Sequence, residues 1–183
     1  MKLKFFLLSF AIWLVPFIIR LSVHIEPSVN ENHEANTNIV VENILKSIDE
    51  HNADTTFALI FKNNMKSCLI NILAGVLFSV GTVVNLLING FASANVFRSV
   101  YDLGFPLTSI LKTTLPHSFE LIGFWLSGTV GFMITWQVVR FMRGKEAFSA
   151  NIIKQIGVLV LIIVVLILGA AYVEANISVN IIQ

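Results

Sequence analysis

Residues 117–139 read HSFELIGFWLSGTVGFMITWQVV, a largely apolar run that opens with a histidine and a glutamate. A membrane-spanning helix needs about 20 consecutive apolar residues, and this run supplies them. An ionisable group inside a bilayer costs roughly 2.5 to 3.5 kcal/mol on insertion scales, so such groups usually face a protein interior or a wet cavity. His117 and Glu120 therefore indicate a polar site inside a membrane protein.

The composition of the whole chain agrees with that interpretation. Hydrophobic residues make up 56% of the 183 residues and charged residues 13%, and the mean hydropathy is +0.81. A formal net charge of +1 provides no basic footprint for nucleic acid, which excludes nucleic-acid partners. The single cysteine, Cys68, rules out an internal disulfide and a C-x-x-C site. We predict one all-α transmembrane bundle with no metal, no cofactor and no enzymatic activity.

The first 23 residues have the charge and length of a signal anchor. Lys2 and Lys4 precede an apolar run, and residues 20–23, Arg-Leu-Ser-Val, lack the small-x-small pattern of a cleavage site. An uncleaved signal-anchor helix over residues 1–23 is therefore expected. Its positively charged end should stay in the cytoplasm.

Residues 24–62 form a polar tract with seven acidic residues against two lysines, which indicates an extracytoplasmic loop. Apolar residues recur in it at helical spacing: Val40, Val41, Ile44, Leu45 and Ile48. This spacing predicts a short amphipathic helix that lies on the membrane, caps the bundle or binds a partner. The transmembrane core is expected at 63–174, followed by a short tail at 175–183.

A second membrane span is predicted over residues 67–89. One face of it, at alternating spacings of four and three, carries Asn64, Cys68, Asn71, Gly75, Phe78, Thr82, Asn85 and Asn89. Amides can hydrogen-bond across helices where lipid offers no partner. We therefore expect this face to pack inside the bundle, against the helix that bears His117, and hydrogen bonding is the simplest role of each asparagine.

Small residues in the run that follows His117 predict close helix packing. Gly123, Ser127 and Gly131 lie at i, i+4 and i+8, a repeated small-x-x-x-small pattern. The last predicted span, residues 156–173, is nearly pure isoleucine, valine and leucine. That composition predicts a helix with lipid on most sides.

Basic residues predict the topology. Arg140, Arg143, Lys145 and Lys154 lie between the last two apolar runs, and short loops rich in lysine and arginine stay cytoplasmic. With the amino terminus also inside, the chain before that loop must cross an even number of times. The clear runs number three, at 5–23, 67–89 and 117–139, so residues 91–114 should supply a further crossing. About five spans and an extracytoplasmic carboxyl terminus follow.

The charged residues inside 91–114 leave two arrangements open. Arg98 and Asp102 lie one helical turn apart and could neutralise each other within the span. Alternatively, both lie near the membrane interface, where charge is less costly.

His117 and Glu120 share a helical face at i and i+3, and Pro116 suits the first turn of their helix. Three roles are open for the pair at this outer mouth of the span. It could satisfy the asparagines of residues 67–89, relay a proton or substrate, or form a metal or catalytic site. The last is disfavoured, because catalytic zinc needs three protein ligands and an H-E-x-x-H motif is absent.

Several motifs recur in a fixed order: Phe61-Lys62-Asn63-Asn64, then Gly75, Phe78, Gly81, Thr82 and Asn89-Gly90, then Leu115-Pro116-His117 with Glu120-Leu121 and Gly128. This series resembles the stage II sporulation protein M (SpoIIM) membrane family over residues 57–173. In that family glycine generally follows the histidine and the acidic motif continues toward Pro-Ala, whereas Ser118 and Ile122-Gly123 stand here.

From the residues and the resemblance together we define two sets. The polar site comprises His117, Glu120, Asn63, Asn64, Asn71, Asn85 and Asn89. The helix-packing residues are Gly75, Gly123, Ser127, Gly128 and Gly131.

The resemblance implies a multispanning protein of the bacterial cell membrane that acts with partners rather than as a free enzyme. Family members recruit peptidoglycan-degrading enzymes at the sporulation septum, and short relatives are encoded with bacteriocin maturation, export and immunity genes. The small size and the motif changes favour the second role. We expect a subunit of a membrane complex that assists export, maturation or immunity for a secreted peptide.

Two alternatives stay open. The first is a scaffold that recruits cell-wall remodelling enzymes, and the second is a transporter or intramembrane enzyme that uses His117 and Glu120. Besides lipid, exporter subunits and cell-wall enzymes, a second copy of the chain is a candidate partner.

Overall fold

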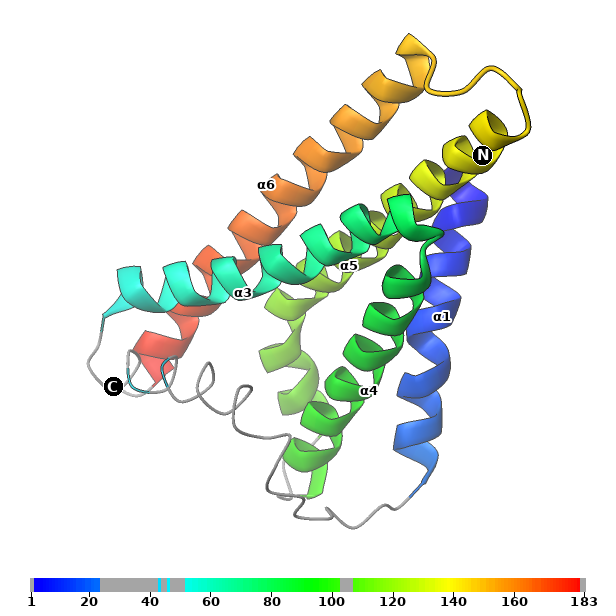
Figure 1. Ribbon diagram of the computed structural model, residues 1–183. Helices are drawn as coiled ribbons and strands as arrows, with labels where there is room; N and C mark the ends of the chain where they lie inside the picture. The colour runs from blue at the N-terminus through cyan, green and yellow to red at the C-terminus, as the bar shows by residue number, and fades with distance from the viewer. Residues whose placement is uncertain (1, 24–42, 44–45, 47–51, 103–106, 182–183) are drawn as a thin grey trace.

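The computed structural model is an all-helical bundle (Figure 1). It describes every residue except 1, 24–42, 44–45, 47–51, 103–106 and 182–183, and the side chains of 99–100, 102, 107–118 and 177–181 also lie outside the described part. The helices are α1 (Lys2–Ser22), α3 (Ala53–Leu73), the 3-10 helix η1 (Ala74–Leu77), α4 (Val80–Asp102), α5 (Leu107–Met142) and α6 (Ala150–Ile181). The predicted all-α membrane bundle is confirmed.

Among the residues that the structure describes, four helical segments are long and apolar enough to cross a membrane: Lys2–Ser22, Val80–Arg98, Phe119–Met142 and Ala150–Asn176. The helix α3 is the fifth long helix and is less apolar, because it carries Asp54, Lys62 and Lys66. It packs against α4, α5 and α6. The bundle therefore consists of four apolar helices and one more polar helix.

The helices alternate in direction along the chain. Trp13 lies against Gly90 and Arg20 bonds Asn95, so α1 and α4 run parallel. In Figure 1 the start of α1, the turn from η1 into α4 and the connection from α5 to α6 lie toward one end of the bundle, and the end of α6 lies toward the other.

A turn at residues 74–79 separates α3 from α4. Phe78 and Ser79 adopt left-handed backbone conformations, with φ of 56° and 58°, and the Ser79 amide donates to the Ala74 carbonyl at 3.0 Å. A left-handed conformation costs roughly 1 to 2 kcal/mol for a residue with a side chain. Hydrogen bonds from Ser79 Oγ to Thr135 Oγ1 (2.5 Å) and from Thr135 Oγ1 to the Gly75 carbonyl (2.6 Å) hold the turn against α5.

This turn corrects the predicted span over 67–89. The spacing of four and three could not reveal a reversal, because each half keeps its own helical face on either side of the turn. In the structure the two halves of the polar stripe face each other from α3 and α4. In the hairpin the asparagine side chains of α3 and α4 satisfy one another's hydrogen-bonding groups. A continuous helix would instead have satisfied them by packing against other helices.

The predicted crossing at 91–114 is also wrong. Residues 91–102 belong to α4 and 107–114 to α5, with 103–106 between them outside the described residues. The additional helix before the basic loop is α3, which the sequence placed partly in the polar loop. Because α5 begins at Leu107, Pro116 lies well inside the helix and not in its first turn.

The proposed pairing of Arg98 with Asp102 involves a side chain outside the described part. Arg98 itself donates to the Leu21 carbonyl of α1 at 3.4 Å. It therefore contributes to the contact between the ends of α1 and α4.

Candidate functional site

The centre of the candidate site is Asn71, which is fully buried where α3, α4 and α5 meet. Its Nδ2 donates to Ser127 Oγ on α5 at 2.9 Å, and Ser127 Oγ donates to the Phe124 carbonyl at 2.8 Å. On the other side, Thr82 Oγ1 of α4 donates to the Asn71 carbonyl at 2.8 Å. One amide thus links three helices.

The hydrogen bonds continue along the contact between α3 and α4. Asn85 Nδ2 donates to Asn71 Oδ1 at 2.9 Å and to the Ser67 carbonyl at 3.1 Å. Asn89 Nδ2 donates to Ser67 Oγ at 3.2 Å and to the Asn85 carbonyl at 2.8 Å. We call this network the polar seam; it comprises Ser67, Asn71, Thr82, Asn85, Asn89 and Ser127.

Of the seven residues predicted for the polar site, the structure joins Asn71, Asn85 and Asn89 in the seam. Asn64 is buried on α3, and Asn63 is exposed on the same helix. These two asparagines therefore face different surroundings although they are adjacent in the sequence.

The ionisable pair lies on α5. The side chain of His117 lies outside the described part of the chain, so its pairing with Glu120 stays a prediction. Glu120 is half-buried and lies within electrostatic range of the fully buried Cys68 on α3. Among the described residues no three His, Cys, Asp or Glu side chains form a group that could hold a metal ion.

The small residues lie at close helix contacts. A Cβ atom at Gly75 would overlap the backbone of Gly131, and one at Gly131 would overlap the Asn71 carbonyl. Gly128 lies against Ser9 of α1, and Gly123 against Ile167 of α6. The α5 surface thus contacts α3, α1 and α6 through its small residues, and a buried apolar cluster completes the core: Cys68, Phe124, Val130, Met133, Leu159, Ile163 and Ile167.

Sequence reasoning missed several polar contacts. Ser67 is part of the seam, Thr135 holds the turn, and Arg20 Nε donates to Asn95 Oδ1 at 2.5 Å. Gln137 is fully buried and accepts a long hydrogen bond of 3.4 Å from the Phe148 amide. A glutamine within an apolar run was a signal for an internal contact, whereas single serines and threonines in apolar helices are too common to indicate one.

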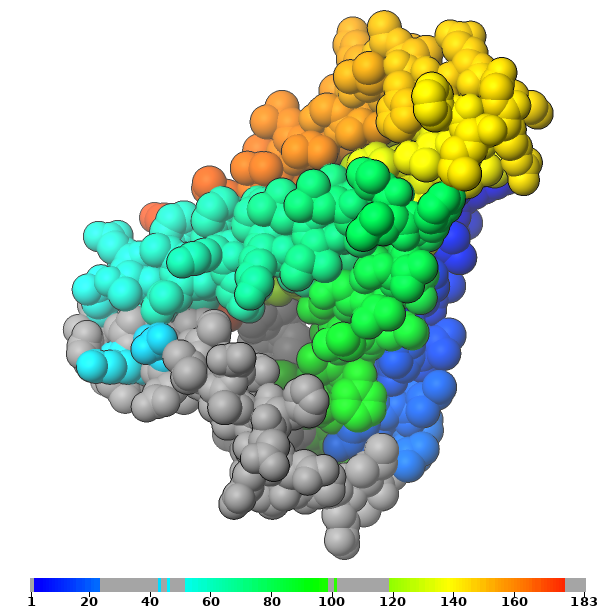
Figure 2. All heavy atoms as spheres, viewed as in Figure 1, coloured from blue at the N-terminus to red at the C-terminus, as the bar shows by residue number. Residues whose placement is uncertain are grey.

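The outer surface of α3 is unexpectedly polar. We call its exposed residues Lys62, Asn63 and Lys66 the α3 ridge. Figure 2 shows α3 along the face of the molecule in view. Within the described part of the chain neither lysine has a carboxylate partner.

The α3 ridge is level with the middle of the apolar part of α4. Lys66 directly precedes Ser67, whose carbonyl and hydroxyl bond Asn85 and Asn89, and Asn89 is central in the apolar segment Val80–Arg98. Lys62 lies one turn nearer the start of α3. Lys66 therefore lies on the outside of the bundle at a depth where the neighbouring helix is apolar, with a second cation one turn away.

Comparison with known proteins gives a family match over nearly the whole chain. The family model described as stage II sporulation protein M matches residues 3–179. A similar protein, the "Uncharacterized protein MJ0793" of Methanocaldococcus jannaschii, is 30% identical over 130 residues, which cover 69% of this chain and 73% of that protein. No solved structure matches the chain.

Proposed function

This chain belongs to the stage II sporulation protein M family, and we propose that it is a non-enzymatic subunit of a complex in the bacterial cell membrane. We further propose that the complex assists export, maturation or immunity for a secreted peptide. The observation that carries the proposal of a complex is the α3 ridge, with its two exposed lysines beside the centre of the bundle.

Contact between the α3 ridge and lipid acyl chains is energetically unfavourable. A lysine near the centre of a spanning helix costs about 2.5 to 3.5 kcal/mol on insertion scales, and the ridge has two, one helical turn apart. A lysine stem can reach toward the interface and lower that cost. A protein partner that supplies acceptors at the same depth removes more of it.

The chemistry of the α3 ridge favours a different protein over a second copy. Two copies in one membrane with a twofold axis along the membrane normal would place α3 against α3 at equal depth. Lys66 would then face Lys66, and like charges repel. A transmembrane helix with an aspartate or glutamate at this depth offers the complementary charge.

The polar seam supports a structural role for the asparagines. Asn71, Asn85 and Asn89 bond one another and nearby serine and threonine groups. Groups that bond each other in this way hold helices together. We therefore place partner binding on the outside of α3 and not in the seam.

The proposed role in export, maturation or immunity for a secreted peptide is based on the family resemblance. Ser118, which stands after His117 where the family generally has glycine, supports it. Its cellular test is deletion of the gene, followed by measurement of peptide secretion and of resistance to that peptide. If secretion and resistance are unchanged and cell-wall cleavage is altered, the role with a secreted peptide is wrong and a role in cell-wall remodelling is favoured.

The membrane complex is tested by crosslinking from the α3 ridge. A photoreactive amino acid at position 63 leaves both lysines in place, and position 161 on α6 is the matched control, because Leu161 is 65% exposed on an apolar helix. We expect position 63, but not 161, to capture a membrane protein that has a carboxylate in a spanning segment.

Charge-reversal variants test whether the crosslink depends on the positive charge of Lys66. Lys66→Glu should abolish the crosslink, Lys66→Arg should keep it, and a carboxylate-to-lysine change in the captured protein should restore it with Lys66→Glu. Capture of lipid alone, capture of a second copy of the chain, or a crosslink that is indifferent to charge reversal would refute the proposed partner.

A further inference from the structure

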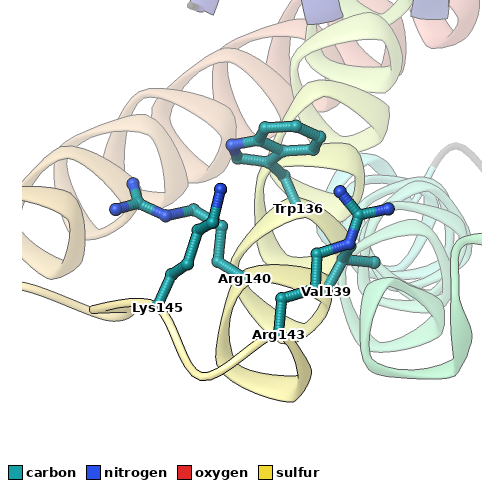
Figure 3. A pocket seen from close by; sticks show the side chains of 5 residues that line it. All are labelled: Trp136, Val139, Arg140, Arg143 and Lys145. Carbon is teal, nitrogen blue, oxygen red and sulfur yellow. The ribbon is translucent and has the colours of Figure 1, made fainter.

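A basic pocket of about 270 Å³ lies where α5 ends, at the end of the bundle that also holds the start of α1. It is lined by Trp136, Val139, Arg140, Arg143 and Lys145 (Figure 3). In this view the Arg140 and Lys145 side chains lie on one side of the Trp136 ring and the Arg143 guanidinium on the other. No carboxylate is among the lining residues.

Backbone hydrogen bonds bring these cations together. Gly144 has a left-handed φ of 65°, and the Gly144 amide donates to the Phe141 carbonyl at 2.9 Å. The Lys145 amide then donates to the Arg140 carbonyl at 3.0 Å. The chain thus reverses over the last turn of α5 and returns Lys145 to the side of Arg140.

The bond from the Phe148 amide to the buried Gln137 side chain fastens the same loop to α5. The basic residues are therefore carried by a connection that is tied to the helix at both ends. An arrangement of this kind is preorganised to bind an anion, because less freedom is lost on binding.

Capping of α5 does not explain the three cations. Cations commonly stabilise a helix carboxyl terminus by bonding its last carbonyl groups. Here backbone amides already bond the carbonyls of Val139, Arg140 and Phe141. Within the described part of the chain, none of the three basic side chains has a hydrogen-bond or ion-pair partner.

The surroundings of the pocket indicate the source of the anion. Trp136 is 43% exposed, and Phe141 and Met142, which lie between Arg140 and Arg143 in the sequence, are 71% and 69% exposed. Tryptophan is enriched at membrane interfaces, and exposed apolar side chains next to a basic pocket suit acyl chains below a charged headgroup. Basic pockets on the cytoplasmic side of membrane proteins bind anionic lipid headgroups.

We propose that the pocket of Trp136, Val139, Arg140, Arg143 and Lys145 binds the phosphate of an anionic phospholipid headgroup. The Arg140 guanidinium and the Lys145 ammonium, on one side of the Trp136 ring, contact the phosphate oxygens, and the Arg143 guanidinium attracts the phosphate from the other side of the ring. Trp136 and Val139 contact the glycerol and upper acyl region. This site is separate from the α3 ridge, and it does not depend on the proposed complex.

The test measures lipid retained by the purified protein, using native mass spectrometry with phosphatidylglycerol, phosphatidylcholine and inorganic phosphate as probes. The variant R140Q/R143Q/K145Q removes the three cations. The matched control K2Q/K4Q/K154Q removes the same amount of charge from exposed residues outside the pocket. We expect the pocket variant to bind phosphatidylglycerol about 100-fold more weakly, from about fivefold per cation near a membrane surface, and the control to bind it like the parent.

A variant with little folding risk is R143Q alone, since Arg143 is exposed; it should bind several-fold more weakly. Equal losses in the pocket variant and the control would overturn the proposal, because they would indicate attraction to net charge alone. Equal retention of phosphatidylcholine would overturn it as well. Inorganic phosphate that competes as strongly as the lipid would identify a free anion as the ligand and overturn the lipid assignment.

Discussion

Asn71 shows how a single amide can organise a membrane bundle. Its side chain donates to α5, accepts from α4 and is carried by α3, while its backbone carbonyl accepts a further bond from α4. An apolar side chain of similar size would fill the space but would remove one of the acceptors of Asn85 Nδ2, which would keep only its bonds to Ser67. A buried unsatisfied polar group costs about 1 to 3 kcal/mol.

Asn71→Leu should therefore destabilise the protein by about 1 to 3 kcal/mol. The matched control is Asn63→Leu, which changes an exposed asparagine of the same helix. Thermal unfolding in detergent should give a lower Tm for Asn71→Leu and a parental or higher Tm for Asn63→Leu. Equal Tm values for both variants would contradict the hydrogen-bonding role of the seam.

Glycine positions offer a second test at the residue scale. Gly75→Ala would place a methyl group into the Gly131 backbone, whereas nothing lies within 4 Å of a Cβ at Gly157. Overpacking typically costs about 1 to 3 kcal/mol, and glycine to alanine within a helix gains roughly 0.5 to 1 kcal/mol. Thermal unfolding should show a loss for Gly75→Ala and a small gain for Gly157→Ala. A gain at both positions would mean that η1 and α5 are not in close contact at Gly75.

At the scale of the elements, apolar length and small-residue spacing predicted the bundle and the helices at 117–139 and 156–173, because these signals depend on composition. The reversal at 74–79 had no such signal. Its left-handed residues are Phe78 and Ser79, where glycine or asparagine would have indicated a turn. Hydrogen bonds to Thr135, 56 residues later, stabilise the turn, and local sequence cannot reveal that contact.

For the candidate site, too, some features could be predicted from the sequence and others could not. Asn71, Asn85 and Asn89 were predictable as internal groups, because amides in an apolar run need partners. Their arrangement across a hairpin was not predictable, since a helical stripe has the same spacing whether or not the chain reverses. Ser67 was not singled out for a similar reason: a serine can bond its own helix carbonyls and needs no distant partner.

The hairpin predicts the sign of a backbone effect at position 78. Glycine adopts a left-handed conformation without strain, whereas alanine pays about 1 kcal/mol or more. In a continuous helix the order reverses, and alanine is more stable by roughly 0.5 to 1 kcal/mol. Thermal unfolding of Phe78→Gly and Phe78→Ala compares the two directly. We expect Phe78→Gly to unfold at the higher temperature, and the opposite order would restore a single helix through residue 78.

For the whole molecule, the parallel course of α1 and α4 places the start of α1, the turn after η1 and the basic loop toward one end. Because Lys2, Lys4 and the basic loop favour the cytoplasmic side, we expect all three to lie inside and the end of α6 outside. This orientation also places the lipid pocket in the inner leaflet, where anionic lipids attract basic groups.

Cysteine labelling in intact cells tests that orientation on a Cys68→Ala background. Asn176→Cys should react with an impermeant reagent, whereas Lys145→Cys and Leu77→Cys should react only after the membrane is permeabilised. Leu77 is 72% exposed beside the turn, so its labelling also tests the hairpin. External labelling of Lys145→Cys would reverse the topology, and a Leu77→Cys variant that never reacts would place residue 77 inside the bilayer.

The parallel pairing of α1 with α4 has a consequence for biosynthesis. Arg20 and Asn95, which bond each other, are 75 residues apart, so α1 leaves the ribosome and enters the bilayer well before its partner helix exists. Until then Ser9 and Trp13, both buried in the finished bundle, have only lipid around them. The helix α1 is therefore inserted into the membrane alone. Its contacts with α4 and α5 form only after these two helices have been synthesised and inserted.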